Sequence, residues 1–136
     1  MTTEDTAAQQ RLTALHNALQ ERILILDGAM GTMLQSFHPQ EPDFRGEILA
    51  QHPVPLKGNN DLLNITKAEY PRQVHRMYLE AGADIIETNT FNSNTVSQTE
   101  YQTGHLVYEM ARAGAVNARA EADSFTAADS GILSIS

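Results

Sequence analysis

Residues 23–32 read Ile-Leu-Ile-Leu-Asp-Gly-Ala-Met-Gly-Thr, in which four consecutive apolar residues are followed at once by a carboxylate and a glycine. A continuous apolar run of this length is typical of a strand that is buried on both faces in a parallel sheet. A second, shorter run, Ala-Asp-Ile-Ile-Glu, occupies residues 83–87, and a polar turn follows it at residues 88–95. The two runs predict two parallel strands, each with polar residues after its carboxyl end.

Apolar residues recur at helical spacing before, between and after these runs. The pattern predicts an amphipathic packing helix, a short helix, a well-defined helix and a longer helix at residues 3–22, 30–37, 71–81 and 103–123. The third helix has two alternative starts, because residues 66–69 have the spacing of a capping box whereas a proline, Pro71, suits the beginning of a helix. Residues 38–64 contain four prolines and two glycines and are expected to form a loop, with a weak helical turn near residues 47–50.

The longest predicted helix carries a glycine on its packing face, which is expected to comprise Val107, Met110, Ala111, Gly114 and Ala118. Gly114 weakens this helix by about 1 kcal/mol relative to alanine. The same glycine allows another part of the chain to pack closely against the helix.

The order of the predicted elements is helix, strand, helix, helix, strand, helix. Strands that alternate with helices imply right-handed crossovers and a parallel sheet. Two parallel strands can neither close a barrel nor cover both faces of a sheet, so the pattern indicates the opening of an α/β fold. From the pattern alone, a small doubly wound fold and an incomplete barrel are equally open.

Length and composition limit the function classes. The 136 residues suffice for one domain, and 41% hydrophobic residues are ordinary for a soluble protein. A net charge of −8 argues against a nucleic-acid partner, because phosphate binding requires a basic face. The start lacks the pattern of a signal peptide, and no apolar stretch approaches the length of a membrane helix, so we expect a cytoplasmic protein without membrane contact. The chain contains no cysteine, and its five histidines show no metal-ligand spacing.

The candidate site lies at the carboxyl ends of the two strands, where ligands bind in parallel α/β folds. Asp27 and Gly28 end the first strand, and Glu87, Asn89 and Thr90 lie at the end of the second. Carboxylates can pair with a cationic amine, and glycine lets a ligand approach the backbone, as in an amino-acid pocket. The alternatives are that Asp27 only caps the following helix, and that the other four are ordinary turn, cap or solvated residues.

Three blocks of sequence resemble a known family. Residues 25–34, residues 44–47 together with 56–63, and residues 81–93 resemble, in this order, the homocysteine-binding domain of the cobalamin-dependent methionine synthase family. A weaker match continues through residues 106–123. The resemblance covers about residues 10–123, and three ordered blocks make it highly specific.

The resemblance implies a fold, a reaction and a site. It implies the first two strand-helix units of a (β/α)8 barrel, preceded by an N-terminal helix, which binds homocysteine at its carboxyl-terminal face. The family transfers a methyl group from methylcobalamin to homocysteine, forming methionine, and methyltetrahydrofolate recharges the cofactor. By resemblance, Asp27 and Gly28 match the loop that holds the amino-acid end of homocysteine, while Glu87, Asn89 and Thr90 match the neighbouring loop.

The family's zinc ligands are cysteines on later strands, and this chain has none. We therefore expect no catalytic residue, metal ligand or cofactor in the chain itself, and an N-terminal fragment that is inactive in isolation. Its expected parts are a helix at residues 1–22, a partial barrel at 23–123 and a divergent tail at 124–136, where residues 131–135 are strand-like. The alternatives are a non-catalytic partner-binding fragment, and one piece of a split barrel completed by another chain. Exposed apolar strands would also favour self-association.

Overall fold

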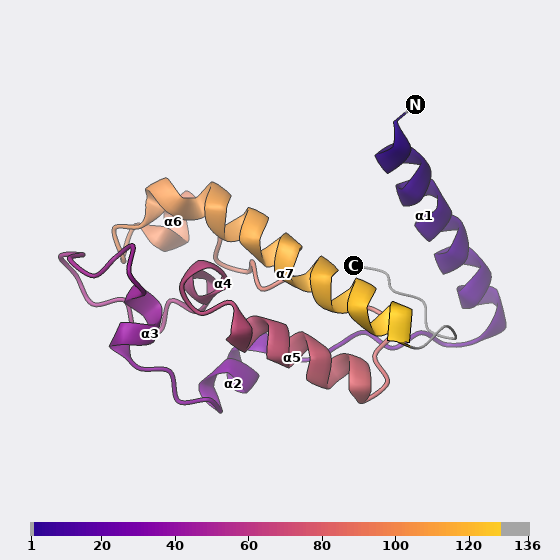
Figure 1. Ribbon diagram of the computed structural model, residues 1–136, viewed down its shortest axis with the longest axis horizontal. Coiled ribbons are helices and arrows are strands. Elements are labelled where there is room, and N and C mark those ends of the chain that lie inside the picture. Colours follow the sequence, from indigo (N-terminus) through magenta and orange to yellow (C-terminus); the bar gives the residue numbers. More distant parts are fainter. Residues whose placement is uncertain (1, 129–136) are drawn as a thin grey trace.

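The computed structural model describes residues 2–128, and its body is built around two helices that lie side by side, α5 (Glu69–Glu80) and α7 (Val107–Ala128) (Figure 1). Helix α1 (Thr3–Glu21) projects away from this body. The remaining elements are short: α2 (Met30–Gln35), α3 (Glu41–Arg45), η1 (Asn60–Leu62), α4 (Leu63–Thr66), α6 (Thr95–Gln98) and η2 (Gly104–Leu106). Within residues 2–128, no helix combines the length and apolar character needed to cross a membrane.

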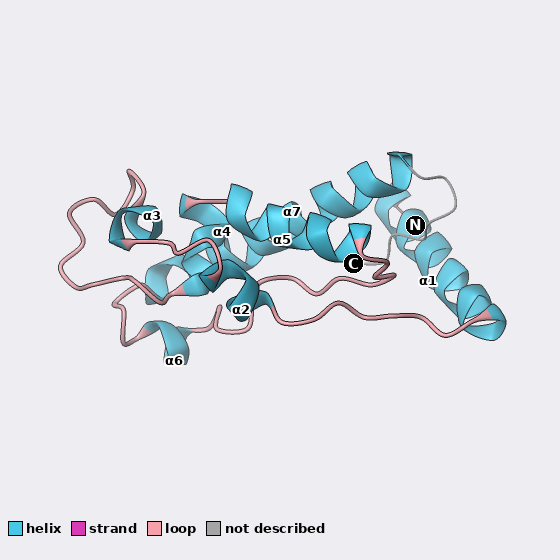
Figure 2. Ribbon diagram, turned by 90° about the horizontal axis from the view of Figure 1, so that it is seen from below, coloured by secondary structure: helices cyan, strands magenta, loops and turns pink. Residues whose placement is uncertain are grey.

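The two predicted strand segments run beside each other but pair only briefly. A single parallel bridge joins Leu26 to Ile85, and Figure 2 draws both segments as loops. The Asp27 amide donates to the Ile85 carbonyl at 2.9 Å, and the Asp84 amide donates to the Ile25 carbonyl at 2.8 Å. The parallel direction of the two segments agrees with the prediction, but within residues 2–128 neither segment forms a strand beyond this bridge, and membership in a barrel stays a prediction.

The predicted burial of the first segment on both faces is wrong. Ile23 is 88% exposed, and Ile25 and Leu26 are exposed as well. In the second segment, Ile86 is buried against α5 and α7. A strand is covered on both faces only when other elements flank it, and within residues 2–128 the first segment has that one bridge as its only strand pairing.

Helix α1 forms where it was predicted but does not pack as predicted. It begins with a capping box between Thr2 and Asp5, which satisfies amide groups at its first turn. Of its residues only Ala18 is buried, and Leu19 on the apolar stripe is 54% exposed. The helix is therefore not a packing helix within the described residues.

An ion pair holds the junction between α1 and the body. Arg22 contacts the two carboxylate oxygens of Asp84 at 2.6 and 2.9 Å, and Asp84 also accepts the Ile25 amide at 2.9 Å. The hydrogen bond from Arg22 holds the pKa of Asp84 below its ordinary value. This ion pair thus ties the end of α1 to the start of the second strand segment.

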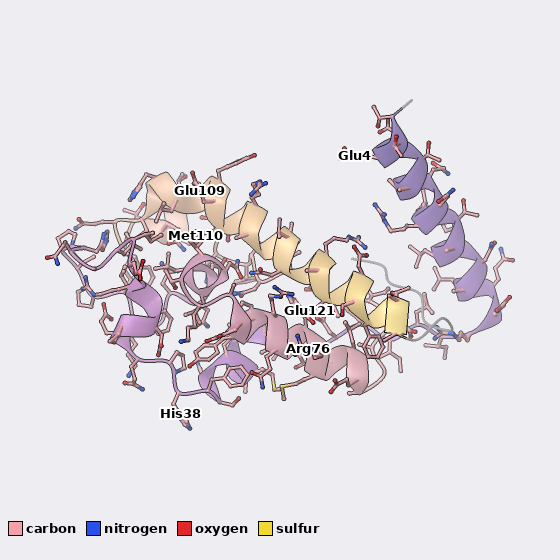
Figure 3. The ribbon with its side chains drawn as sticks, in the orientation of Figure 1. Glu4, His38, Arg76, Glu109, Met110 and Glu121 are labelled. Atoms are coloured by element: carbon pink, nitrogen blue, oxygen red, sulfur yellow. The ribbon has the colours of Figure 1, made fainter. Side chains whose placement is uncertain are left out.

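The predicted packing face of α7 is largely correct. Met110, Gly114 and Ala118 are buried, whereas Val107 and Ala111 are only half-buried. Below Ala118 the face becomes polar, because Glu121 is buried and pairs with two arginines of α5 (Arg72 and Arg76). Arg76 and Glu121 face each other between the two helices in Figure 3. The tail residues up to Ala128 continue α7, and residues 131–135 lie outside the described part of the chain.

The region predicted as a loop, residues 38–64, contains α3, η1 and the first residues of α4, so that prediction is wrong in part. Pro42 lies in the first turn of α3, where proline needs no amide donor. Helix α5 begins similarly, at Glu69 with Pro71 in its first turn. No side-chain cap precedes it, so the capping-box start is wrong.

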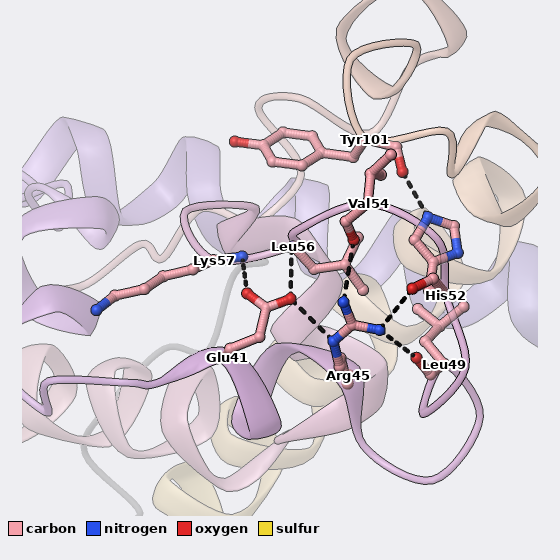
Figure 4. A network of polar contacts seen from close by, with 8 residues as sticks. All are labelled: Glu41, Arg45, Leu49, His52, Val54, Leu56, Lys57 and Tyr101. Carbon is pink, nitrogen blue, oxygen red and sulfur yellow. Dashed lines mark hydrogen bonds and ion pairs between the residues drawn. The ribbon is translucent and has the colours of Figure 1, made fainter.

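A hydrogen-bonded clamp orders the chain after α3 (Figure 4). The Glu41 carboxylate accepts the amides of Leu56 and Lys57, each at 2.7 Å, and the Arg45 guanidinium at 2.9 Å. Burial acts to raise the pKa of Glu41, but these donors outweigh it and lower that pKa. Arg45 in turn donates to three carbonyl groups of the loop, those of Leu49, His52 and Val54. The clamp fixes the path of the chain immediately before η1.

Candidate functional site

One open cavity of about 370 Å³ lies at the carboxyl ends of the two strand segments. Residues 27–32 and 87–92 form two of its walls, and Asn60 and Asp61 of η1 form the third. All five predicted site residues, Asp27, Gly28, Glu87, Asn89 and Thr90, line it. The structure therefore brings these five residues together, and their role in binding stays a prediction.

Asp27 links the two strand ends. Its carboxylate accepts the backbone amide of Glu87 at 3.1 Å. Burial raises the pKa of Asp27; the amide of Glu87 opposes this rise, and the charge of Glu87 adds to it. Helix α2 has Ala29 as its N-cap and no side-chain cap, so the alternative that Asp27 caps this helix is wrong.

Gly28 is small for a reason that the sequence did not reveal. A Cβ atom at this position would lie 3.0 Å from the hydroxyl oxygen of Tyr78, on α5. That hydroxyl donates to the Ala29 carbonyl at 2.9 Å. The glycine thus lets α5 pack against the loop after the first strand segment, and this contact secures one wall of the cavity.

The two polar residues of the second wall have internal partners. The Asn89 side chain is buried, and it donates to the Asn60 carbonyl and to the Asn64 side chain, both at 3.0 Å. The Thr90 hydroxyl lies 2.7 Å from that of Thr88. These contacts show that Asn89 holds the loop against η1, in addition to lining the cavity.

Gly114 of α7 supports the same wall from behind. The side chain of Asn64 donates to the Asn89 carbonyl at 2.7 Å and to the Met110 carbonyl at 3.1 Å. A Cβ atom on Gly114 would lie 2.6 Å from the Thr90 methyl group and 2.8 Å from the Asn64 amide nitrogen. Only glycine leaves room at this crossing, as the predicted close packing required.

Asp61, which is 2% exposed, was not among the predicted site residues. Its Oδ2 atom accepts the Asn92 amide at 2.8 Å and the Ser93 hydroxyl at 2.7 Å. Burial raises the pKa of Asp61, while these two donors oppose the rise. The one sequence feature that pointed to Asp61 was its position in residues 56–63, which resemble the family. The rule that ligands bind at the ends of strands does not apply to it, because it lies in the long connection between the two strand segments.

The cavity is chemically asymmetric. Asp27, Asp61 and Glu87 supply carboxylates, whereas Phe91 is 93% exposed at the rim and offers an apolar surface. A carboxylate pairs with an ammonium group through a charge-assisted hydrogen bond. The arrangement suits a small molecule that combines a cationic amine with an apolar chain.

The residues present do not fit the zinc site that the resemblance implies. Thiolates are the ligands expected there, and the 136 residues include no cysteine. Residues 2–128 also contain no group of three or more histidine and carboxylate side chains that could hold a metal ion. No chemical step through zinc or cobalamin is therefore assigned to this chain.

Comparison with protein families identifies the chain. Residues 24–135 match the family model described as homocysteine S-methyltransferase, a family of methyltransferases that act on homocysteine. The matched range contains the second strand segment, the first segment except Ile23, η1 and every residue that lines the cavity. Because the match spans well over half of its length, this chain belongs to the homocysteine S-methyltransferase family.

Proposed function

We propose that the cavity holds the amino-acid end of homocysteine, in a methyltransferase of the cobalamin-dependent methionine synthase type. In such an enzyme the methyl group passes from methylcobalamin to homocysteine and yields methionine. The role of this chain is to bind and orient the substrate. It does not complete the transfer in isolation, because the thiolates that would hold zinc are not among its residues.

The observation that carries this proposal is the half-buried carboxylate of Asp27 at the cavity wall. Its raised pKa reflects an ionised form that is poorly solvated and lies beside the charge of Glu87. An ammonium group placed between the two would compensate both charges. A hydrogen bond of this charge-assisted kind contributes about 1.5–3 kcal/mol.

The size and the apolar rim of the cavity also support the proposal. A volume of about 370 Å³ lies in the range of roughly 300–1,000 Å³ that small-molecule sites occupy. Homocysteine joins its ammonium and carboxylate to two methylene groups and a thiol. Phe91 offers an apolar surface for those methylene groups, while the carboxylates face the ammonium.

Titration calorimetry of the chain with homocysteine tests the proposal. Asp27→Asn should weaken binding by roughly tenfold to a hundredfold, and more than Glu87→Gln does, because Glu87 is exposed. Glu109→Gln, an exposed change on α7 outside the cavity, is the matched control and should leave the affinity unchanged.

A second ligand isolates the ammonium contact. N-acetylhomocysteine has no cationic amine and should bind wild type no better than homocysteine binds the Asp27→Asn variant. If Asp27→Asn and wild type bind homocysteine equally well, the proposed role of Asp27 is refuted.

A further inference from the structure

The third wall of the cavity depends on η1, a turn far from both strand segments in the sequence. The Asn60 carbonyl accepts the side chain of Asn89, at one end of the loop formed by residues 89–93. Asp61 accepts the Asn92 amide and the Ser93 hydroxyl, at the other end of that loop. Two consecutive residues thus hold both ends of the loop that carries Phe91.

Asp61 is a buried carboxylate that takes part in no ion pair among the described residues. Its partners are the neutral donors of Asn92 and Ser93. Burying a carboxylate without a counter-ion is unfavourable, so a core position of this kind would normally be neutral. Such groups are concentrated at functional sites.

The two other buried acidic residues of the described chain differ from it. Asp84 is paired with Arg22, and Glu121 with Arg72 and Arg76. Of the three, Asp61 is the one that lines the cavity.

We propose that Asp61 is a positioning residue for substrate binding, which acts by fixing residues 91–93 so that Phe91 and Asn92 form a defined wall of the cavity. This inference rests on the proposed function. Asp61 sets where the apolar rim at Phe91 lies relative to Asp27, which lines the same cavity. A substrate held at both its ammonium and its methylene groups therefore requires Asp61, although the contacts of Asp61 are with the loop.

Three variants distinguish a residue that positions the loop for substrate binding from one that only stabilises the fold. Asp61→Ala removes both contacts. Asp61→Asn keeps an oxygen that can accept both donors but removes the charge. Ser93→Ala removes one donor and leaves the Asn92 amide in place. Glu121→Gln is the matched control, because it changes another buried carboxylate that does not line the cavity.

The readouts are homocysteine affinity by calorimetry and the amide resonance of Asn92 by NMR, both on protein shown to be folded by circular dichroism. Asp61→Ala should weaken binding roughly tenfold or more, and Asp61→Asn should restore it to within roughly threefold of wild type. Ser93→Ala should fall between these two. The Asn92 amide resonance should shift in Asp61→Ala, and Glu121→Gln should leave both affinity and resonance unchanged.

Two results would overturn the inference. One is a folded Asp61→Ala variant that binds homocysteine as tightly as wild type. The other is an affinity that Asp61→Asn fails to restore although its Asn92 resonance matches wild type. Failure of the proposed function is recognised separately, because then wild type binds no homocysteine and Asp27→Asn has nothing to weaken; that result ends both proposals.

Discussion

Replacing Gly114 with alanine sets two opposing effects against each other. Alanine has the higher helix propensity, so the change would stabilise a free helix by about 1 kcal/mol. In the folded chain, however, the new methyl group would lie 2.6 Å from the Thr90 methyl carbon and 2.8 Å from the Asn64 amide nitrogen. Both distances are shorter than any normal contact, so these side chains must move.

The movement is costly because Asn64 is already engaged. Its amide donates to the carbonyls of Asn89 and Met110, and both bonds are in the buried interior. Overpacking costs about 1–3 kcal/mol, and a buried acceptor that loses its donor costs about 1–3 kcal/mol. After the gain in propensity is subtracted, the Gly114→Ala variant should lose about 1–5 kcal/mol of unfolding free energy.

Urea unfolding followed by circular dichroism measures this difference. Gly104→Ala is the control, because a Cβ atom there meets nothing within 4 Å, and it should change stability by less than about 0.5 kcal/mol. Gly114→Ala should also weaken homocysteine binding, since Thr90 and Asn89 line the cavity. A Gly114→Ala variant that is more stable than wild type would show that helix propensity outweighs the contact, and would refute this reasoning.

Homocysteine binding should weaken as the pH falls, because the ammonium group pairs with ionised Asp27. The raised pKa of Asp27 means that the loss begins at a higher pH than for an ordinary aspartate, and calorimetry between about pH 7 and about pH 4 should show it in wild type but not in Asp27→Asn. His75 is fully buried with neither ring nitrogen hydrogen-bonded, and burial lowers its pKa to about 4. Because burial disfavours the charged form, the free energy of unfolding is highest above a pH of about 6.5. It decreases as the pH falls towards about 4, the pKa of His75 in the folded chain. His75→Phe should raise the unfolding free energy at neutral pH by about 1 kcal/mol and reduce that acid sensitivity; an unchanged acid dependence would contradict the assignment. The chain should also self-associate through its exposed apolar segment, and replacing Ile23 and Ile25 with lysine should reduce the mass seen by sedimentation; a wild type that is monomeric at every concentration would argue against this.

Local pattern was sufficient for the longer helices and for the residues that gather at one cavity, but not for the short helices α3, α4 and α6. Helical spacing predicted α1 and α5 to within two residues of their observed bounds. This is possible because the spacing of apolar residues in an amphipathic helix is a local property of the sequence. The strand-end rule placed Asp27 and Glu87 on one cavity, because parallel strands bring their carboxyl ends to the same edge. Both inferences use information within a few residues of the element concerned.

Burial was not available from the same patterns. The run at residues 23–26 is apolar on every side, yet Ile23 is exposed, because burial depends on what other elements cover a segment. Leu19 in α1 is exposed for the same reason. An apolar segment is suited to burial, but it is buried only where neighbouring elements of the fold cover it.

The sequence by itself determined the family, the helices α1, α2, α5 and α7, and five residues that the fold gathers at one cavity. Only the tertiary structure decided what those residues contact. Asp27 accepts an amide from the other strand end instead of capping α2, and Gly28 makes room for Tyr78. Asp61 reaches the site from η1, just after the segment that the Glu41 clamp holds. The physical reason is distance along the chain: each contact joins residues at least fifteen positions apart, and no repeat or local motif encodes a contact that forms only when separate segments pack together.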